Sequence, residues 1–183
     1  MTETHFHINM PHLGQTYSHY TLQKLIRKTN LSCVYTAIDN ETHKTVAVKF
    51  IYVCDANKSK VDNELQLMKE LNSPYIIKPC DTFDYSEFAC IVMPYCENGD
   101  LSKNPKTSKG ISENEARKIF KSILLGLKYL HDQNIWHRDV KMENILLNNR
   151  NEAVLTDFGL AIKNPQKQPL TEFVGTVQYA APE

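Results

Sequence analysis

Alternation between apolar and polar residues dominates the first half of the chain and predicts a sheet. Runs rich in β-branched and aromatic residues, separated by turn-forming residues such as Asn40–His43, indicate antiparallel strands joined as a meander. The expected strands are Tyr20–Ile26, Ser32–Asp39, Lys44–Ile51, Ile76–Phe83 and Phe88–Met93.

Apolar residues at three- and four-residue spacing predict two helices. The first spans Lys58–Leu71 and ends before Pro74. The second spans Glu113–Asp132, and Ser112 with Glu115 forms a capping box at its start. The expected apolar positions are Val61, Leu65, Met68 and Leu71 on the first helix, and Ala116, Ile119, Phe120, Ile123, Leu124, Leu127 and Leu130 on the second.

The chain divides into a strand-rich half, a connector and a helix-rich half, which indicates the α+β class. Short strands are expected in the second half at Ile145–Leu147 and Ala153–Thr156, around a polar turn. The predicted organisation is a loose tail over residues 1–19, a strand-rich unit over 20–93, a connector over 94–100 and a helix-rich unit over 101–183.

The predicted tail carries four histidines, which raises the alternative of a metal-binding tract. These are His5, His7, His12 and His19. Their irregular spacing favours a solvated tail over a metal site. The first twenty residues contain no apolar run of the kind found in a secretory signal.

Composition and charge exclude several classes of protein. The 183 residues include 21 Lys and Arg and 21 Asp and Glu, so the formal net charge is zero. A protein that binds nucleic acid by neutralising phosphates normally has a basic excess. No apolar run is long enough to cross a membrane. The five cysteines form no Cys-x-x-Cys pair, which favours reduced thiols in the cytoplasm over disulfides or a zinc site.

Chemistry-bearing residues occur in several short motifs along the chain. Lys49 lies on the third predicted strand, and Glu64 follows fifteen residues later on the first helix. Taken alone, Lys49 fits a solvated charge on a strand. The later motifs are His137–Asn144, Thr156–Gly159 and Gly175–Glu183. Each motif is weak by itself, but their order and spacing together are specific.

In this order and spacing the motifs resemble those of protein kinases, which share a strand Lys, a catalytic loop, Asp-Phe-Gly and Ala-Pro-Glu. Lys141 and Thr176 are similar to the Ser/Thr-specific pattern, and Asn98–Leu101 resembles the calmodulin-kinase-like branch. The resemblance implies a bilobal α+β fold. Its N-lobe would be an antiparallel five-stranded sheet with one main helix, followed by an incomplete helical C-lobe that ends after Ala-Pro-Glu.

The resemblance also implies ATP and Mg²⁺ as cofactors and a protein substrate that presents Ser or Thr. Asp139 would orient the substrate hydroxyl, and Lys49, oriented by Glu64, would hold phosphates. The implied catalytic residues are Asp139, Lys141, Lys49 and Glu64. The implied nucleotide-binding residues are Lys49, Val34, Ala47, Met93, Pro94, Cys96, Asp100 and Leu146. The implied metal ligands are Asn144 and Asp157.

The sequence departs from the kinase pattern at the loop that covers the phosphates. Arg27, Thr29 and Ser32 occupy its three glycine positions. A β-branched residue in left-handed geometry costs about 1–2 kcal/mol, whereas Asn30 tolerates that geometry and is expected to take over the turn. We therefore expect weaker or less closely covered ATP.

The chain ends at Glu183, so we expect a truncated domain. A missing C-lobe segment or a partner would then cover the exposed side of the second helix. Three functions stay open at this point. They are an ATP-dependent Ser/Thr kinase, a pseudokinase-like nucleotide- or protein-binding module with little or no activity, and a nucleotide-binding regulatory domain without phosphotransfer.

One position suggests how the segment before Ala-Pro-Glu is ordered. In the family, a phosphorylated Thr often lies three residues before the Gly of the Gly-Thr pair and binds the Arg of the catalytic loop. Here Glu172 occupies that position, so its carboxylate is expected to pair with Arg138. The alternative is a solvated Glu172 with Thr171 as the phosphorylation site.

Overall fold

The computed structural model describes residues 10–104 and 110–180. The described residues form two compact units, which we describe separately. The first unit consists of residues within Met1–Val61 and Pro79–Tyr95, and the second of residues within Asp62–Lys78 and Cys96–Glu183. The predicted first helix therefore contributes to both units.

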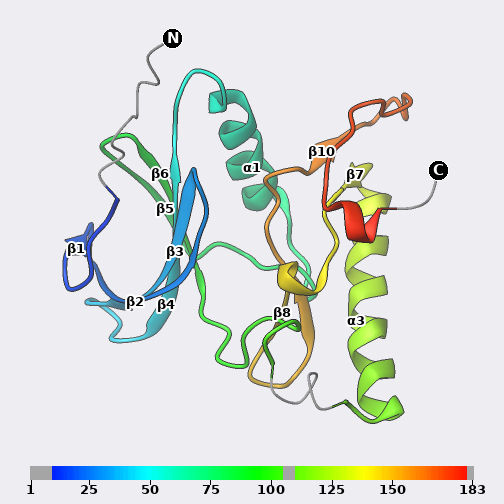
Figure 1. Cartoon of the computed structure of the whole chain (residues 1–183), viewed down its shortest axis with the longest axis horizontal. Helices are drawn as coiled ribbons and strands as arrows, with labels where there is room; N and C mark the ends of the chain where they lie inside the picture. Colours follow the sequence, from blue (N-terminus) through cyan, green and yellow to red (C-terminus); the bar gives the residue numbers. More distant parts are fainter. Residues whose placement is uncertain (1–9, 105–109, 181–183) are drawn as a thin grey trace. The chain divides into compact units, whose positions relative to one another are not determined.

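The first unit is built on a six-stranded antiparallel sheet with the order β1-β2-β3-β4-β6-β5, and Figure 1 labels its strands. Its strands are β1 (Thr16–Tyr17), β2 (Tyr20–Lys28), β3 (Ser32–Asp39), β4 (Thr45–Tyr52), β5 (Asp81–Tyr85) and β6 (Phe88–Pro94). The expected α+β class and the meander are confirmed. The sequence predicted five strands, and β1 is the additional one. The fourth predicted strand was placed too early, because β5 begins only at Asp81.

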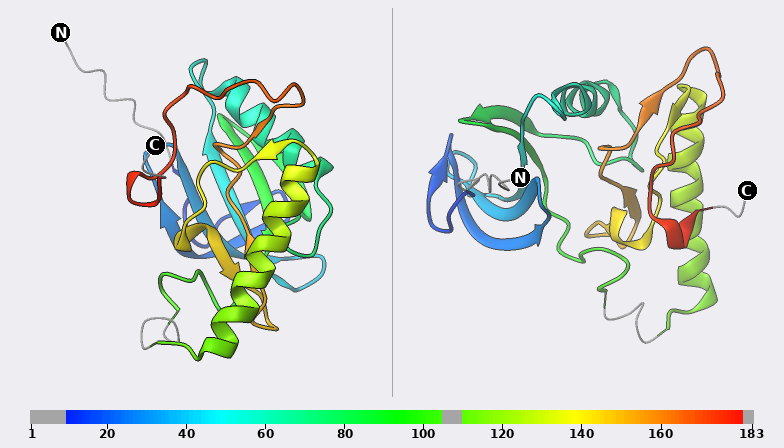
Figure 2. Two further views of the ribbon diagram at one scale, coloured as in Figure 1. Left: turned by 90° about the vertical axis from the view of Figure 1, so that its right-hand side faces the viewer. Right: turned by 45° about the horizontal axis from the view of Figure 1, so that its top comes forward.

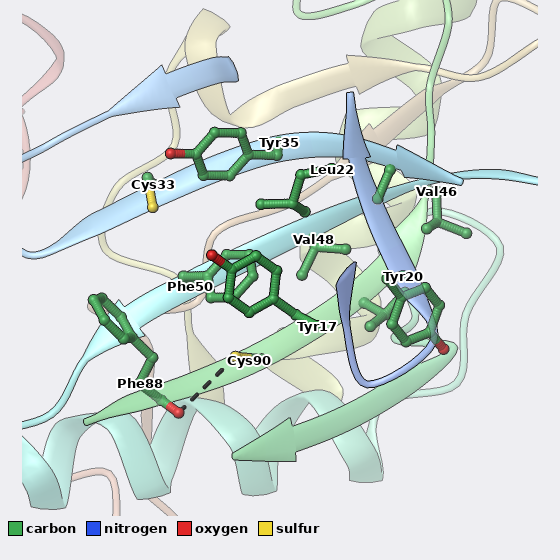
Figure 3. Close-up of a cluster of buried hydrophobic side chains, with 12 residues drawn as sticks. Tyr17, Tyr20, Leu22, Cys33, Tyr35, Val46, Val48, Phe50, Phe88 and Cys90 are labelled. Carbon is green, nitrogen blue, oxygen red and sulfur yellow. Dashed lines mark hydrogen bonds between the residues drawn. The ribbon is translucent and has the colours of Figure 1, made fainter. Parts of the chain in front are cut away.

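An aromatic core covers one face of this sheet (Figure 3). Phe50 lies in the middle of the cluster, and Tyr17 packs edge-on against it with ring centroids 5.3 Å apart. The Tyr35 hydroxyl donates a hydrogen bond of 2.7 Å to the Pro11 carbonyl oxygen. The predicted loose tail is therefore wrong for residues 10–19, since burying the Tyr17 ring contributes apolar stabilisation that a solvated tail would lack. The histidines His5 and His7 lie outside the described residues.

Helix α1 spans Lys58–Glu70, and its later part belongs to the second unit. Helix α3 spans Glu113–Asp132, as predicted. Its capping box is present: Ser112 Oγ accepts from the Glu115 amide at 3.3 Å, and Glu115 Oε2 accepts from the Ser112 amide at 3.2 Å. The other elements of the second unit are β7 (Ile135–Trp136), η1 (Met142–Asn144), β8 (Ile145–Leu147), β9 (Ala153–Leu155), β10 (Ile162–Lys163) and η2 (Val177–Tyr179).

Helix α3 packs beside β9 (Figure 2), and its buried residues are Ser122, Gly126 and Leu130. A Cβ at Gly126 would lie 3.0 Å from Leu155 Cδ1 and 3.2 Å from the Tyr75 carbonyl oxygen, so glycine permits this approach. The predicted apolar stripe is only partly buried, because Phe120 is 61% exposed and Leu124 is 49% exposed. What covers these side chains remains a prediction. No helix in the described part of the chain could cross a bilayer.

Candidate active site

In the first unit, four predicted nucleotide-site residues share one face of the sheet. Val34 pairs with Lys49 and Thr36 with Ala47, while Ala47 also pairs with Met93. Because directly opposed residues in antiparallel strands project to the same side, Val34, Ala47, Lys49 and Met93 lie on the face opposite the aromatic core.

This face places an ammonium group beside buried apolar side chains. Ala47 and Met93 are buried, whereas Lys49 is half-buried. Pro94 differs from the other predicted residues, since it pairs with Val46 of the aromatic-core row and is exposed. An apolar surface with a cation next to it suits a flat base that carries phosphate.

The turn between β2 and β3 closes without glycine. The Thr29 amide donates to the Ser32 carbonyl oxygen at 2.8 Å, and the Ser32 amide donates to Thr29 Oγ1 at 3.0 Å. The two hydroxyl groups are 2.9 Å apart. The expectation that Asn30 adopts left-handed geometry is wrong, because no residue of this turn has a positive φ. The strain expected for Thr29 does not arise, since hydrogen bonds from side chain to backbone shape the turn instead.

In the second unit, Asp100 and Leu146 lie opposite each other in an isolated antiparallel bridge. The Asp100 carboxylate accepts hydrogen bonds from the Lys103 amide, at 2.9 Å, and from the Ser102 hydroxyl. Cys96, which is buried, precedes them in the chain. Asp100 therefore stabilises the turn that follows it, and its expected role toward a ribose remains a prediction.

Asp139 is the centre of a polar cluster in the predicted catalytic loop, His137–Asn144, which is called the catalytic loop below. Its Oδ1 accepts from the Thr176 hydroxyl at 2.7 Å, and its Oδ2 accepts from Asn144 Nδ2 at 2.9 Å. Lys141 Nζ lies 2.7 Å from Asp139 Oδ2 and also donates to Thr176 Oγ1 at 2.7 Å. The structure thus brings together three residues predicted from the sequence and adds Thr176.

These contacts set the charge of Asp139. Burial acts to raise the pKa of its carboxyl group. Hydrogen bonds from Lys141, Thr176 and Asn144, together with the Lys141 charge, act in the opposite direction and prevail, so the pKa lies below its ordinary value. Asp139 is therefore ionised at neutral pH and can accept a hydrogen bond from a substrate hydroxyl.

His137 fixes the backbone beside Asp139. Its Nε2 lies 3.0 Å from the Thr156 carbonyl oxygen, to which only an N–H can bond, and its Nδ1 accepts from the Asp139 amide at 3.3 Å. Its ring packs against Phe158, with centroids 5.1 Å apart. Burial lowers the pKa of His137, and both hydrogen bonds fit the neutral ring.

Asp157 follows β9, and the residue before it, Thr156, is hydrogen-bonded to the catalytic loop. The Thr156 amide donates to the Asn144 carbonyl oxygen at 3.0 Å. Asp157 has a φ of 67°, in the left-handed region that Asp adopts more readily than most residues. A Cβ at Gly159 would lie 3.3 Å from Glu64 Oε2, so glycine leaves room for this buried carboxylate. The predicted Lys49–Glu64 ion pair joins residues of different units and remains a prediction.

Arg138 links the catalytic loop to the segment around Glu172. Its Nε donates to the Leu160 carbonyl oxygen at 2.7 Å, and its Nη1 donates to Glu172 Oε2 at 3.1 Å. The predicted pairing of Glu172 with Arg138 is confirmed. Gly175, with a φ of 102°, passes so close that a Cβ there would lie 2.5 Å from the Arg138 carbonyl oxygen. Because Gly175 lies so close to Arg138, the next residue, Thr176, reaches Asp139 and donates a hydrogen bond to its carboxylate. The sequence signal for it was the Gly-Thr pair.

Asn144 and Asp157 suit a hard divalent cation. Because Asn144 Nδ2 donates to two oxygens of Asp139, its Oδ1 is the atom that a metal would take. The described residues include no cluster of three or more His, Cys, Asp or Glu that would hold a metal by itself. Mg²⁺ is commonly bound by one or two protein oxygens together with phosphate oxygens, and this donor set fits that habit.

Comparison with known proteins places these features in a family. The protein kinase domain model matches residues 20–183. The chain is 36% identical over 167 residues to serine/threonine-protein kinase SIK1 of Rattus norvegicus, and 31% identical over 178 residues to serine/threonine-protein kinase PLK4 of Drosophila virilis. These alignments cover 90% and 93% of this chain but only 22% and 23% of the relatives, so the chain spans less than a quarter of their length.

Proposed function

Because the chain belongs to the protein kinase family, we propose that it transfers the γ-phosphoryl group of ATP to Ser or Thr hydroxyls of proteins. The observation that carries this proposal is the Asp139 cluster, in which a carboxylate of lowered pKa is held by Lys141, Asn144 and Thr176. Such a carboxylate is ionised and has fixed orientation. These are the two properties needed to receive a substrate hydroxyl.

Asp139 would orient the substrate hydroxyl and take its proton as the hydroxyl oxygen bonds to the γ-phosphorus and the bond from that phosphorus to the leaving ADP breaks. Lys141, at 2.7 Å from the same carboxylate, would offset the negative charge that builds up around the transferred group. Lys49 would bind phosphates on the sheet face that it shares with Val34 and Ala47. Asn144 and Asp157 would hold Mg²⁺, which would supply positive charge to offset the charge of the phosphates.

The test is transfer of labelled phosphate from ATP to a Ser/Thr peptide by the 183-residue chain. Asp139→Asn is expected to reduce transfer about a hundredfold or more while ATP binding persists, because its work is at the hydroxyl. Asp132→Asn is the matched control, since that carboxylate lies on the surface of α3, where it pairs with Lys128 of the same helix.

Two outcomes would change the proposal. Transfer that survives Asp139→Asn would contradict the assignment of the catalytic group. Binding of ATP by the unaltered chain without any transfer would support the alternative of a nucleotide-binding module.

Location and kinase branch are further parts of the proposal. The five cysteines are all free thiols, which supports a reducing, cytoplasmic location. The similarity to SIK1 supports the calmodulin-kinase-like branch expected from the sequence. Proteins that present Ser or Thr would be the substrates.

A further inference from the structure

Two cations lie in one cross-strand row of the first unit's sheet. Arg27 pairs with Val34, and Val34 pairs with Lys49. Directly opposed residues project to the same face, and neighbouring strands are about 4.8 Å apart. The Cα atoms of Arg27 and Lys49 are therefore about 10 Å apart on one face, with Val34 between them.

The next residue along β2 belongs to the opposite face. Lys28 pairs with Cys33, and Cys33 pairs with Phe50 of the aromatic core. Lys28 is exposed, whereas Arg27 is half-buried. Two adjacent cations are thus separated by the pleat of the strand, which makes Lys28 a natural control for Arg27.

In the turn that follows Arg27, the Thr29 and Ser32 amides donate hydrogen bonds within the turn itself. Backbone N–H groups of a glycine-rich loop are the usual donors to nucleotide phosphates. Here the Thr29 amide is bonded to the Ser32 carbonyl oxygen and the Ser32 amide to Thr29 Oγ1, at 2.8 and 3.0 Å. These two donors reach a phosphate only if the turn opens.

We propose that Arg27 is a phosphate-binding residue that, with Lys49, holds the polyphosphate of the nucleotide in place of these backbone amides. The inference rests on the proposed function, because it states how the nucleotide of that function is held. A guanidinium group presents two parallel N–H donors that match two phosphate oxygens, and it keeps its charge at any physiological pH. Arg27 thereby supplies from a side chain what the missing glycines would supply from the backbone.

The experiment measures the dissociation constants of the full chain for MgATP and for adenosine at one salt concentration. Arg27→Gln is expected to weaken MgATP binding about tenfold or more and to leave adenosine binding unchanged, because only the phosphates are contacted. Arg27→Lys keeps the positive charge but loses the two parallel N–H donors, so it is expected to give a dissociation constant for MgATP between those of the unaltered chain and Arg27→Gln. Lys28→Gln is expected to match the unaltered chain for both ligands.

The other possible results would contradict either the phosphate role of Arg27 or the proposed function as a whole. If Arg27→Gln binds MgATP as the unaltered chain does while Lys49→Met binds it more weakly, Arg27 has no phosphate role and the proposed function stands. If Arg27→Gln weakens MgATP and adenosine equally, the residue is structural and the inference fails. If the unaltered chain binds no MgATP at all, the proposed function fails and the inference fails with it.

Discussion

Replacing Gly175 with alanine is expected to release the segment that carries Thr176 from the catalytic loop. Gly175 has a φ of 102°, and a Cβ there would lie 2.5 Å from the Arg138 carbonyl oxygen. Real Cβ atoms essentially never approach so closely, and the obstacle is backbone rather than a side chain that can rotate. The matched control is Gly99→Ala, because Gly99 has a φ of 66° but no atom within 4 Å of its Cβ position.

The magnitude follows from two costs and one gain. Left-handed geometry costs about 1–2 kcal/mol for an alanine at either position, and the clash adds to this only at Gly175. Thr176 bonds to Asp139 and Lys141, both charged, and each such bond contributes about 1.5–3 kcal/mol. An alanine in place of Gly175 therefore costs these roughly 1–2 kcal/mol and the backbone clash as well. Both act against the roughly 3 kcal/mol or more that holds the segment in place, and detachment of the segment relieves both.

Amide hydrogen exchange measures this release. For Gly175→Ala, the Tyr179 and Ala180 amides, which bond to carbonyl oxygens within the same segment, are expected to exchange about tenfold faster or more. For Gly99→Ala, the melting temperature is expected to fall by about 2–8 °C without this local change. If the two variants show equal exchange in residues 176–180, the steric reasoning is refuted.

Two further predictions concern the same unit. Glu172→Gln is expected to weaken the interaction with Arg138 by about 0–1 kcal/mol, because Glu172 is 55% exposed. The rate of trypsin cleavage after Lys167 should then rise up to several-fold, whereas Thr171→Ala should leave that rate unchanged. The lowered pKa of His137 means that the unfolded chain binds the proton more tightly, so stability is full above about pH 6.5 and declines as pH falls toward the folded-state pKa. Denaturant unfolding from pH 7 to 5 checks this, and a His137→Gln variant with the same slope would contradict it.

Helix α3 was predictable to the residue because its signals are local. The Ser112–Glu115 capping box marks its start, and the apolar period runs unbroken to its last turn. Which side of α3 is buried was less predictable. Gly126 lies against Leu155 of β9, where a Cβ would come within 3.0 Å of Leu155 Cδ1. A hydrophobic pattern does not mark such a position, because what it requires is the absence of a side chain.

Strand β1 was missed for a different reason. Two residues cannot show a period, and Thr16–Tyr17 is identified as a strand only by its pairing with Thr21 and Tyr20. The pairing of β1 with β2 and the burial of the Tyr17 ring both depend on tertiary structure. The same holds for the turn at Thr29–Ser32, where glycine loss suggested strain but hydroxyl groups completed the hydrogen bonds.

The residues of the predicted catalytic loop, His137–Asn144, could be selected from the sequence because the chemistry expected of them fixes their types and order. Thr176 and the contact of Arg138 with Leu160 were not in the predicted site, since they depend on how a later segment folds back in the second unit. Glu172 was predicted from its distance to Gly175, which shows that spacing within a short motif carries tertiary information when a family supplies the frame.

The short strand β1 also has a consequence for self-association. Among the described residues, β2 has one side open beyond Leu22, whose backbone still bonds to Gly14 and Gln15, and an open strand edge is a template on which another chain can add a strand. Irregular pairing at Leu22–Lys24 and Leu25–Arg27 and the charges of Lys24, Arg27 and Lys28 make that edge a poor template. Removing Thr16–Tyr17 would open the regular start of β2 and uncover the aromatic face at once. Fusion and truncation boundaries placed inside residues 10–19 are therefore the ones that favour intermolecular β-aggregates.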